Sequence, residues 1–218
     1  DGTITFKLDA NSTTMAAQVR GTFTGWDVDA LVMEREEDTA AGTATFTINA
    51  QVPKKGGLYR YGIYTGLNTY VGDPGNNITY KQTPVVVRNP EIGNGTVTIY
   101  CPYEGTLPSS SKVEYREVRT TGSPKTAKFA KVEDSENLYA AEITDATAGK
   151  EYEYQIKIGD NEATYDPYNF ETRIVNKTTL EVSTTFTPVA KVTEPAFESP
   201  VLGEDQRTVT FNYFAPNA

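Results

Sequence analysis

Hydrophobic and polar residues alternate with a period of two along most of the chain. The alternation is cleanest at residues 3–8, 44–48, 96–100 and 208–213, where Val, Ile, Thr, Phe and Tyr predominate. Such runs are typical of strands with one buried and one exposed face. Clusters of Gly, Pro, Asn and Asp separate them as turns, and no stretch keeps a helical period. The pattern predicts an all-β fold of antiparallel sandwiches.

The openings of these runs repeat along the sequence. Gly-Thr-Ile-Thr-Phe at 2–6 is matched by Gly-Thr-Val-Thr-Ile at 95–99 and by Arg-Thr-Val-Thr-Phe at 207–211. Successive openings lie roughly one immunoglobulin-like domain apart. The last opening is either the final strand of the second domain or the first strand of a third, and its match to the other two favours a third.

We therefore expect tandem immunoglobulin-like β-sandwich domains within a longer modular protein, to which further domains are covalently joined. The expected divisions are a first sandwich at 1–90, a second at 91–195, and a linker with the first strand of a truncated further domain at 196–218. Pro188, Pro195 and Pro200 indicate that the second boundary is an extended linker.

Each of the two complete units contains a late Tyr-rich strand followed by an Asp-Pro turn. The strands lie at 58–64 and 151–158. Alternation in the first strand points Tyr59 and Tyr61 inward, and Gly62 and Tyr64 outward, so that Gly62 leaves room for a ligand beside Tyr64. The two turn aspartates, Asp73 and Asp166, are expected to cap backbone N–H groups rather than bind metal.

Composition excludes several classes of function. The chain has no histidine, one cysteine (Cys101) and a formal net charge of −9. Histidine-dependent catalysis, histidine metal sites and an internal disulfide are therefore absent, and Cys101 is expected to be a small buried residue or a neutral surface position. The acidic charge argues against nucleic acid, and no apolar run reaches the roughly 18 residues that a membrane span needs.

One ordered set of residues carries a family resemblance. Val-Arg-Gly-Thr-Phe-Thr-Gly-Trp at 19–26 is followed by Met33, by a strand ending at Val52-Pro53, and by the 57–61 segment with its two tyrosines; the Asp-Pro turn comes last. This order resembles the starch- and glycogen-binding sandwich modules of the carbohydrate-binding module 48 type. The resemblance covers residues 1 to about 90.

The resemblance implies a site for α-glucan. Trp26 matches a tryptophan that stacks on a glucose ring, and Tyr70 matches a second stacking aromatic. Gly62 stands where many relatives carry a lysine that contacts sugar hydroxyls. At this position the chain departs from the family pattern, so the resemblance assigns no residue to that contact. Asn68 and Asn76 lie near loops that supply hydrogen-bonding groups in relatives. The physical alternative for Trp26 is a core position, and Tyr64, Tyr70 and other exposed tyrosines can simply support a sheet.

The second unit lacks a tryptophan and resembles a fibronectin type III domain. Its Ala-Gly-Lys-Glu-Tyr-Glu-Tyr run at 148–154 implies that Tyr152 is the corner tyrosine, which closes the sandwich by hydrogen bonding to backbone. Domains of this type are usually spacers or interaction modules. Tyr103, Tyr165 and Tyr168 are candidates for a second sugar platform.

No catalytic residues, metal ligands or cofactor are expected. The acidic cluster at 34–38 is interpreted as a solvated loop rather than a glycosidase pair, and no Asp-x-Asp-x-Asp calcium loop occurs. We expect a non-catalytic α-glucan-binding part of a secreted or cell-surface bacterial amylolytic or starch-adherence protein. The alternatives are a structural tandem of an adhesin or surface stalk without a sugar ligand, and a protein-docking module.

Overall fold

The computed structural model describes most of the chain. The described residues are 3–28, 31–36, 42–53, 55–66, 68–176 and 181–192, with short strands at 196–197, 201–202, 209–210 and 213–214. Within them every regular element is a β-strand and every ladder is antiparallel. The predicted all-β fold is therefore confirmed. No helix in this part of the chain is long and apolar enough to cross a membrane.

Two sheets make up the first unit, residues 3–88. Its strands are β1 (Thr3–Asn11), β2 (Ala17–Gly21), β3 (Leu31–Val32), β4 (Glu34–Arg35), β5 (Thr43–Gln51), β6 (Gly57–Thr65), β7 (Thr69–Gly72), β8 (Thr79–Tyr80) and β9 (Thr83–Arg88). One sheet has the order β1-β5-β4, and the other has the order β8-β9-β6-β2-β3 with β7 paired to β6.

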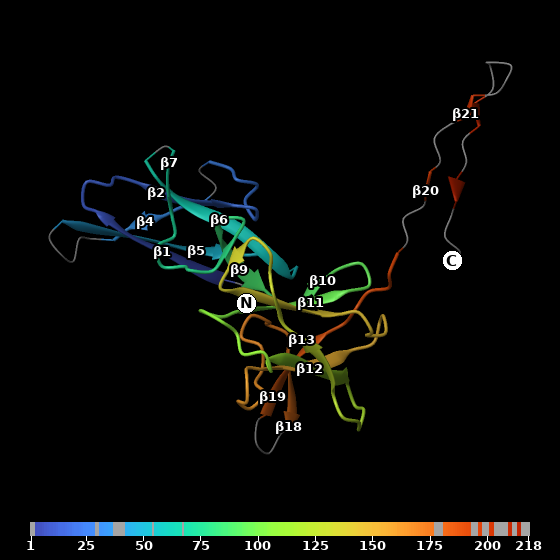
Figure 1. Cartoon of the computed structure of the whole chain (residues 1–218). Helices are drawn as coiled ribbons and strands as arrows, with labels where there is room; N and C mark the ends of the chain where they lie inside the picture. Colours follow the sequence, from blue (N-terminus) through green and yellow to red (C-terminus); the bar gives the residue numbers. More distant parts are fainter. Residues whose placement is uncertain are drawn as a thin grey trace.

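The second unit, residues 91–186, repeats this arrangement. Its strands are β10 (Glu91–Ile92), β11 (Val97–Pro102), β12 (Lys112–Glu117), β13 (Lys125–Lys128), β14 (Ala130–Lys131), β15 (Ser135–Glu136), β16 (Leu138–Ile143), β17 (Tyr152–Lys157), β18 (Thr172–Asn176) and β19 (Glu181–Phe186). The sheets β11-β16-β14 and β18-β19-β17-β12-β13 follow the strand order of the first unit, and β10 is added at the edge of β11. Figure 1 shows the two units as two groups of strands.

Each unit buries one hydrophobic cluster between its two sheets. In the first unit Phe6 and Phe46 face Val19 and Ile63 of the other sheet, while Lys7 on the opposite face of β1 is exposed. The second cluster is likewise shared between sheets and includes Val97, Ile99, Val113, Tyr154 and Phe186. Burying one such side chain contributes about 1.5–3 kcal/mol, so these residues hold the facing sheets together.

A hydrogen-bonded tyrosine closes the core of the first unit at the Asp-Pro turn. The Tyr61 hydroxyl donates to Asp73 Oδ2 at 2.5 Å and accepts from Asn76 Nδ2 at 2.9 Å. The other carboxylate oxygen of Asp73 accepts the Gly75 N–H at 3.0 Å. The prediction that Asp73 caps a backbone N–H is therefore confirmed.

The second unit contains the same network. The Tyr154 hydroxyl donates to Asp166 Oδ2 at 2.7 Å and accepts from Asn169 Nδ2 at 3.0 Å, and Asp166 Oδ1 accepts the Tyr168 N–H at 2.9 Å. In both units the tyrosine precedes the aspartate by 12 residues. Burial raises the pKa of Tyr154 well above its usual range, so its hydroxyl keeps the proton that it donates.

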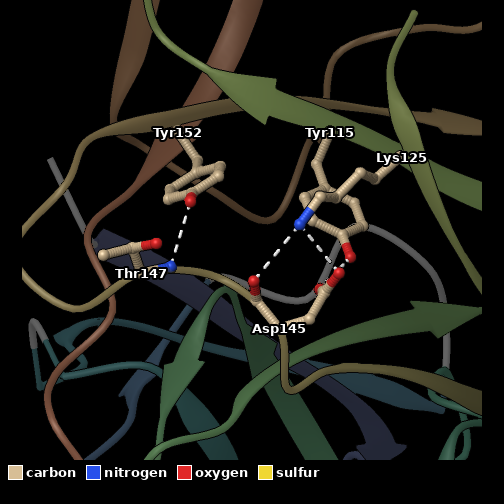
Figure 2. A network of polar contacts seen from close by, with 5 residues as sticks. All are labelled: Tyr115, Lys125, Asp145, Thr147 and Tyr152. Carbon is tan, nitrogen blue, oxygen red and sulfur yellow. Dashed lines mark hydrogen bonds and ion pairs between the residues drawn. The ribbon is translucent and has the colours of Figure 1, made fainter.

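A second tyrosine in the second unit bonds to backbone. Figure 2 shows the Tyr152 hydroxyl accepting the Thr147 N–H at 3.0 Å. Beside it, Asp145 accepts hydrogen bonds from the Tyr115 hydroxyl and, at 2.9 Å, from the Lys125 ammonium. The expected hydrogen bond between the Tyr152 hydroxyl and the backbone is therefore present.

The two units are joined by a strand that crosses between them. β15 of the second unit pairs with β8 of the first, with Ser135 opposite Tyr80. The Lys81 N–H donates to the Asp134 carbonyl at 2.7 Å next to this pair. Lys81 and Asp134 have positive φ values of 49° and 54°. One residue on each side of the joint therefore adopts the left-handed backbone conformation. The larger sheet of the first unit therefore continues into the second unit.

A buried asparagine forms the other half of the joint. Asn89 Nδ2 donates to Asp166 Oδ2 at 2.8 Å and to the Tyr100 carbonyl at 2.7 Å, while its Oδ1 accepts the Tyr100 N–H at 2.8 Å. The Asn89 N–H donates to the Tyr168 carbonyl at 2.9 Å. The segment that connects the units is thereby fixed to the second unit.

The last described strands pair only with one another within the described residues. β20 (Ala196–Phe197) pairs with β23 (Tyr213–Phe214), and β21 (Val201–Leu202) pairs with β22 (Val209–Thr210). In Figure 1, β20 and β21 stand clear of both units. Positions 207, 208 and 211 of the repeated opening lie outside the described residues, so a further domain from 196 stays a prediction.

Candidate functional site

The outer face of the larger first-unit sheet carries the predicted tyrosines. β2 and β6 pair with Val19 opposite Ile63, both of which are buried in the core. The neighbouring pair, Arg20 opposite Gly62, therefore faces outward. Tyr64 follows two residues after Gly62 and lies on the same outer face, as alternation in the sequence predicts.

Tyr70 lies directly over Gly62. A Cβ at position 62 would come within 2.4 Å of Tyr70 Cε2, so only glycine allows this contact. Tyr70 also meets Tyr64 edge to face, with 5.3 Å between ring centroids and an interplanar angle of 63°. The expectation that Gly62 leaves room for a ligand beside Tyr64 is wrong, because the Tyr70 ring fills that space. The two rings, here called the tyrosine pair, form one unit whose outer member is 49% exposed.

Arg20 supports the tyrosine pair from below. Its guanidinium lies 4.3 Å from the centroid of the Tyr64 ring, a cation–π distance. Arg20 Nη1 donates to Asn68 Oδ1 at 3.1 Å, which ties the β6–β7 hairpin back to β2. The arginine is buried although its strand face points outward. Asn68 therefore lies beside the arginine that contacts Tyr64, and its side-chain oxygen accepts from that arginine.

Trp26 lies in a tight loop that follows β2. Its N–H donates to the Gly21 carbonyl at 2.9 Å, and the Thr24 N–H donates to the same oxygen at 3.0 Å. Gly21 directly follows Arg20. The loop is therefore anchored one residue away from the Arg20–Gly62 pair, over which Tyr70 lies. Trp26 is 36% exposed and lies outside the buried core. Trp26 is therefore not a core residue, and its stacking on a sugar stays a prediction.

The backbone of Trp26 is unusual. Its φ is 62°, in the left-handed region that residues other than glycine enter only at a cost of about 1–3 kcal/mol. Such strain persists only where the surrounding structure fixes it. Here the two hydrogen bonds to the Gly21 carbonyl fix the loop. The hydrogen-bonded loop therefore fixes the backbone of an exposed tryptophan.

Asn76 has a structural position. Its Nδ2 donates to the Tyr61 hydroxyl and to the Val85 carbonyl at 3.0 Å, and its Oδ1 accepts the Ile78 N–H at 2.9 Å. Burial, followed by the hydrogen bond with Asp73, raises the pKa of Tyr61 far above its usual range. The polar atoms of Asn76 therefore hold the Asp-Pro turn in place.

The surface combines aromatic faces with little fixed charge. Burial, then the neighbouring Tyr64 and Asp73, raises the pKa of Tyr70, so its hydroxyl stays protonated and neutral at pH 7. No three His, Cys, Asp or Glu side chains group so as to hold a metal ion within the described residues. Glu34 and Glu36 of the acidic cluster are exposed, and Glu37 and Asp38 lie outside the described residues. The arrangement suits stacking on a neutral ring.

The second unit has a different surface at the equivalent place. Glu114 and Gln155 form the cross-strand pair that corresponds to Arg20 and Gly62. Glu114 is also ion-paired with Lys112 at 2.9 Å. A charged face therefore replaces the aromatic one. Of the tyrosines that the sequence suggested for a second platform, Tyr165 is exposed, while Tyr103 and Tyr168 are half-buried.

Sequence reasoning missed Arg20. The signal was present, because a charged residue stood at an outward position of β2 beside an outward glycine of β6. Recognising it required the pairing of two strands that are far apart in sequence and the hairpin position of Asn68.

Comparison with known proteins adds little. No family model matches the chain, and no curated protein matches it. Among solved structures, the chain is similar to pullulanase type I from Bacillus subtilis str. 168 in complex with maltose, at 9% sequence identity and a TM-score of 0.26. The match covers 75% of this chain and 23% of that chain, so the chain spans about a quarter of the pullulanase. Function is therefore argued from the geometry of the chain itself.

Proposed function

We propose that the first unit binds neutral α-glucan (starch, glycogen or maltooligosaccharides) without catalysis, by stacking sugar rings on Tyr70 and Trp26. The observation that carries the proposal is the exposed tyrosine pair, held over Gly62 by the buried Arg20. A glucose ring has apolar C–H faces that match an aromatic face, and hydroxyl edges that match amides. Asn68 lies at the edge of the pair and Tyr64 is its inner member.

The support for this proposal is pre-organisation. An aromatic side chain that is already fixed loses little conformational entropy when it stacks on a ligand. Tyr70 is fixed by Tyr64 and Gly62, and Trp26 by its loop. An open surface still buries little area, so we expect weak binding that repetition on a polymer strengthens.

The fold of the two units also belongs to this proposal. We infer tandem immunoglobulin-like β-sandwiches, which the repeated strand order, the shared Tyr-Asp-Asn network and the corner tyrosine support. The second unit then positions the first within a secreted or cell-surface protein that acts on or adheres to α-glucan.

The proposal is tested by native affinity electrophoresis in gels that contain amylopectin, glycogen, pullulan, dextran or xylan. We expect amylopectin and glycogen to retard the protein, and Tyr70→Ala and Trp26→Ala each to weaken binding about tenfold, since each removes one stacking ring worth roughly 1.4 kcal/mol. Tyr165→Ala is the matched control, an exposed tyrosine of the other unit. Absence of retardation in every gel contradicts the proposal, and retardation as strong as that of the wild type in both single variants moves the site elsewhere.

The second candidate is a structural role in a surface stalk or adhesin. The joint favours this role. The pairing of β15 with β8 and the hydrogen bond from Asn89 to Asp166 hold the two units together, as a rigid spacer requires. Fluorescence separates the two candidates. Trp26 is the single tryptophan, so maltoheptaose quenches or shifts its emission if the first candidate is correct and leaves it unchanged if the second is.

A further inference from the structure

A further exposed aromatic ring lies at the joint between the units. Phe170 follows the Asp-Pro-Tyr-Asn turn of the second unit and is 50% exposed. The guanidinium of Arg88, at the end of β9 in the first unit, lies 4.5 Å from the centroid of its ring. Arg88 is itself buried. The arginine therefore lies against one face of the ring while half of the residue remains exposed.

The construction repeats that of the tyrosine pair. In both places a buried arginine lies under an aromatic ring, at 4.3 Å for Arg20 and Tyr64 and at 4.5 Å for Arg88 and Phe170. A guanidinium against one face restrains the ring and leaves the other face for a ligand. The two sites differ in that Arg88 and Phe170 come from different units.

The ring borders a cleft between the units of about 440 Å³. That volume lies within the range of small-ligand pockets. Besides Phe170, the lining includes Lys55, Arg88, Glu171 and Thr187. Its charged groups have both signs, and together with a hydroxyl they offer donors and acceptors around an apolar face.

The walls of the cleft are rigid. Gly56 packs against Pro90 so closely that a Cβ at position 56 would come within 1.6 Å of the proline carbonyl oxygen. Asn89, which also lines the cleft, is held by its hydrogen bonds to Asp166 and Tyr100. The shape of the cleft is therefore set before any ligand enters, which lowers the entropic cost of binding.

We propose that the Phe170 cleft is a second sugar-binding subsite, which stacks one glucose ring of an α-glucan on Phe170 and bonds its hydroxyls through Lys55 and Glu171. This inference rests on the proposed function of the first unit. It replaces Tyr103, Tyr165 and Tyr168 as the second sugar platform. Glu171 supplies a hydrogen-bond acceptor for sugar hydroxyls, and Lys55 supplies donors.

Two subsites on one rigid protein act together on a polymer. Once the tyrosine pair has bound a glucan, the effective concentration of the same polymer at the cleft rises, so a weak second site increases overall affinity. We therefore expect Phe170→Ala alone to lower affinity for amylopectin about threefold. The effect on an oligosaccharide that occupies only one of the two sites is smaller.

The experiment uses the whole chain in affinity electrophoresis with amylopectin. The background variant combines Trp26→Ala with Tyr70→Ala, which removes the stacking rings of the first unit. We expect weak residual retardation in this background, and we expect Phe170→Ala or Phe170→Leu to abolish it while Phe170→Tyr retains it. Phe170→Leu keeps the apolar bulk but has no aromatic face. Loss of retardation in this variant therefore reports lost stacking rather than a change in the fold. Tyr165→Ala is again the exposed aromatic control.

A spectroscopic readout locates the second ligand directly. The Arg88 Nε–H resonance in a 15N-correlated NMR spectrum of the background variant should shift on addition of maltoheptaose, because the guanidinium lies against the Phe170 ring. If the wild type binds glucan but Phe170→Ala equals it and the Arg88 resonance does not move, the subsite is overturned and the proposed function stands. If the wild type binds no glucan at all, both fail together.

Discussion

At the scale of single residues, the candidate site depends on an absent side chain. Gly62 has no Cβ, and Tyr70 occupies the space that a Cβ would take. Alternation along β6 predicted that Gly62 and Tyr64 point outward, and they do. It could not predict that Tyr70 folds back over Gly62, because that contact depends on the β6–β7 hairpin. Cys101 was expected to be either a small buried residue or a neutral surface position, and it is buried, which raises the pKa of its thiol to about 12.

Substitution of Gly62 by alanine tests this dependence. The added methyl group must displace the end of the Tyr70 side chain, which can rotate away, so we expect a stability cost of about 1 kcal/mol or less. Glucan affinity should fall about tenfold, as in Tyr70→Ala, because the outer ring loses its position. Gly122→Ala is the control, since a Cβ there meets no atom within 4 Å. If amylopectin retards Gly62→Ala as strongly as the wild type, the position of Tyr70 over Gly62 does not affect binding.

At the scale of elements, polar side chains complete what strand pairing leaves open. The loop between β16 and β17 carries Asp145, which accepts from Tyr115 on β12 and from Lys125 on β13. Those hydrogen bonds, first Tyr115 and then Lys125, hold the pKa of Asp145 below its usual range. The corner role of Tyr152 was predictable from a local motif. The Asp145 contacts were not, because they join strands that no short motif relates.

The pH dependence of stability follows from the lowered pKa of Asp145. A lowered pKa in the folded state gives a stabilisation that is present above the unfolded value, about 4, and is lost as pH falls through the folded value. Asp145→Asn should therefore be less stable than the wild type at pH 7, by at most about 1 kcal/mol because the pair is exposed. Urea denaturation at pH 7 and pH 3 checks this. The difference should be smaller at pH 3, which lies below the unfolded pKa, and Asp160→Asn should show none; a difference at pH 3 as large as that at pH 7 refutes the explanation.

At the scale of the whole molecule, the joint makes one body of two units. The Asp-Pro turns were visible in the sequence, but their continuation into a matching Tyr-Asp-Asn network became clear only from the hydrogen bonds. The cross-unit pairing of β15 with β8 was not predictable, since two-residue strands carry no periodic signal. Asn89 lies next to the predicted division between residues 90 and 91, and the sequence analysis gave it no role.

Removing the Asn89 side chain should weaken the joint measurably. Asp166 is fully buried, and Asn89→Ala deletes one of its hydrogen-bond donors at 2.8 Å. Leaving a buried polar group without one partner costs about 1–3 kcal/mol, so we expect the free energy of unfolding to fall by about that amount. Urea denaturation measures it, with the exposed Asn161→Ala as control. A change below about 0.5 kcal/mol would mean that the amide contributes nothing to stability.

The sheet that runs from β3 through β8 into β15 also determines how the protein moves in solution. Two domains on a loose tether reorient almost independently, each with the rotational diffusion of a small sphere. Here the tether is hydrogen-bonded at Asn89 and the neighbouring strands are paired, so both units must turn as one elongated particle. Nitrogen-15 relaxation should then give amides of β6 and β17 a common anisotropic diffusion tensor, whose long axis follows the line between the units. A ligand bound to one unit therefore keeps a fixed orientation relative to the other unit.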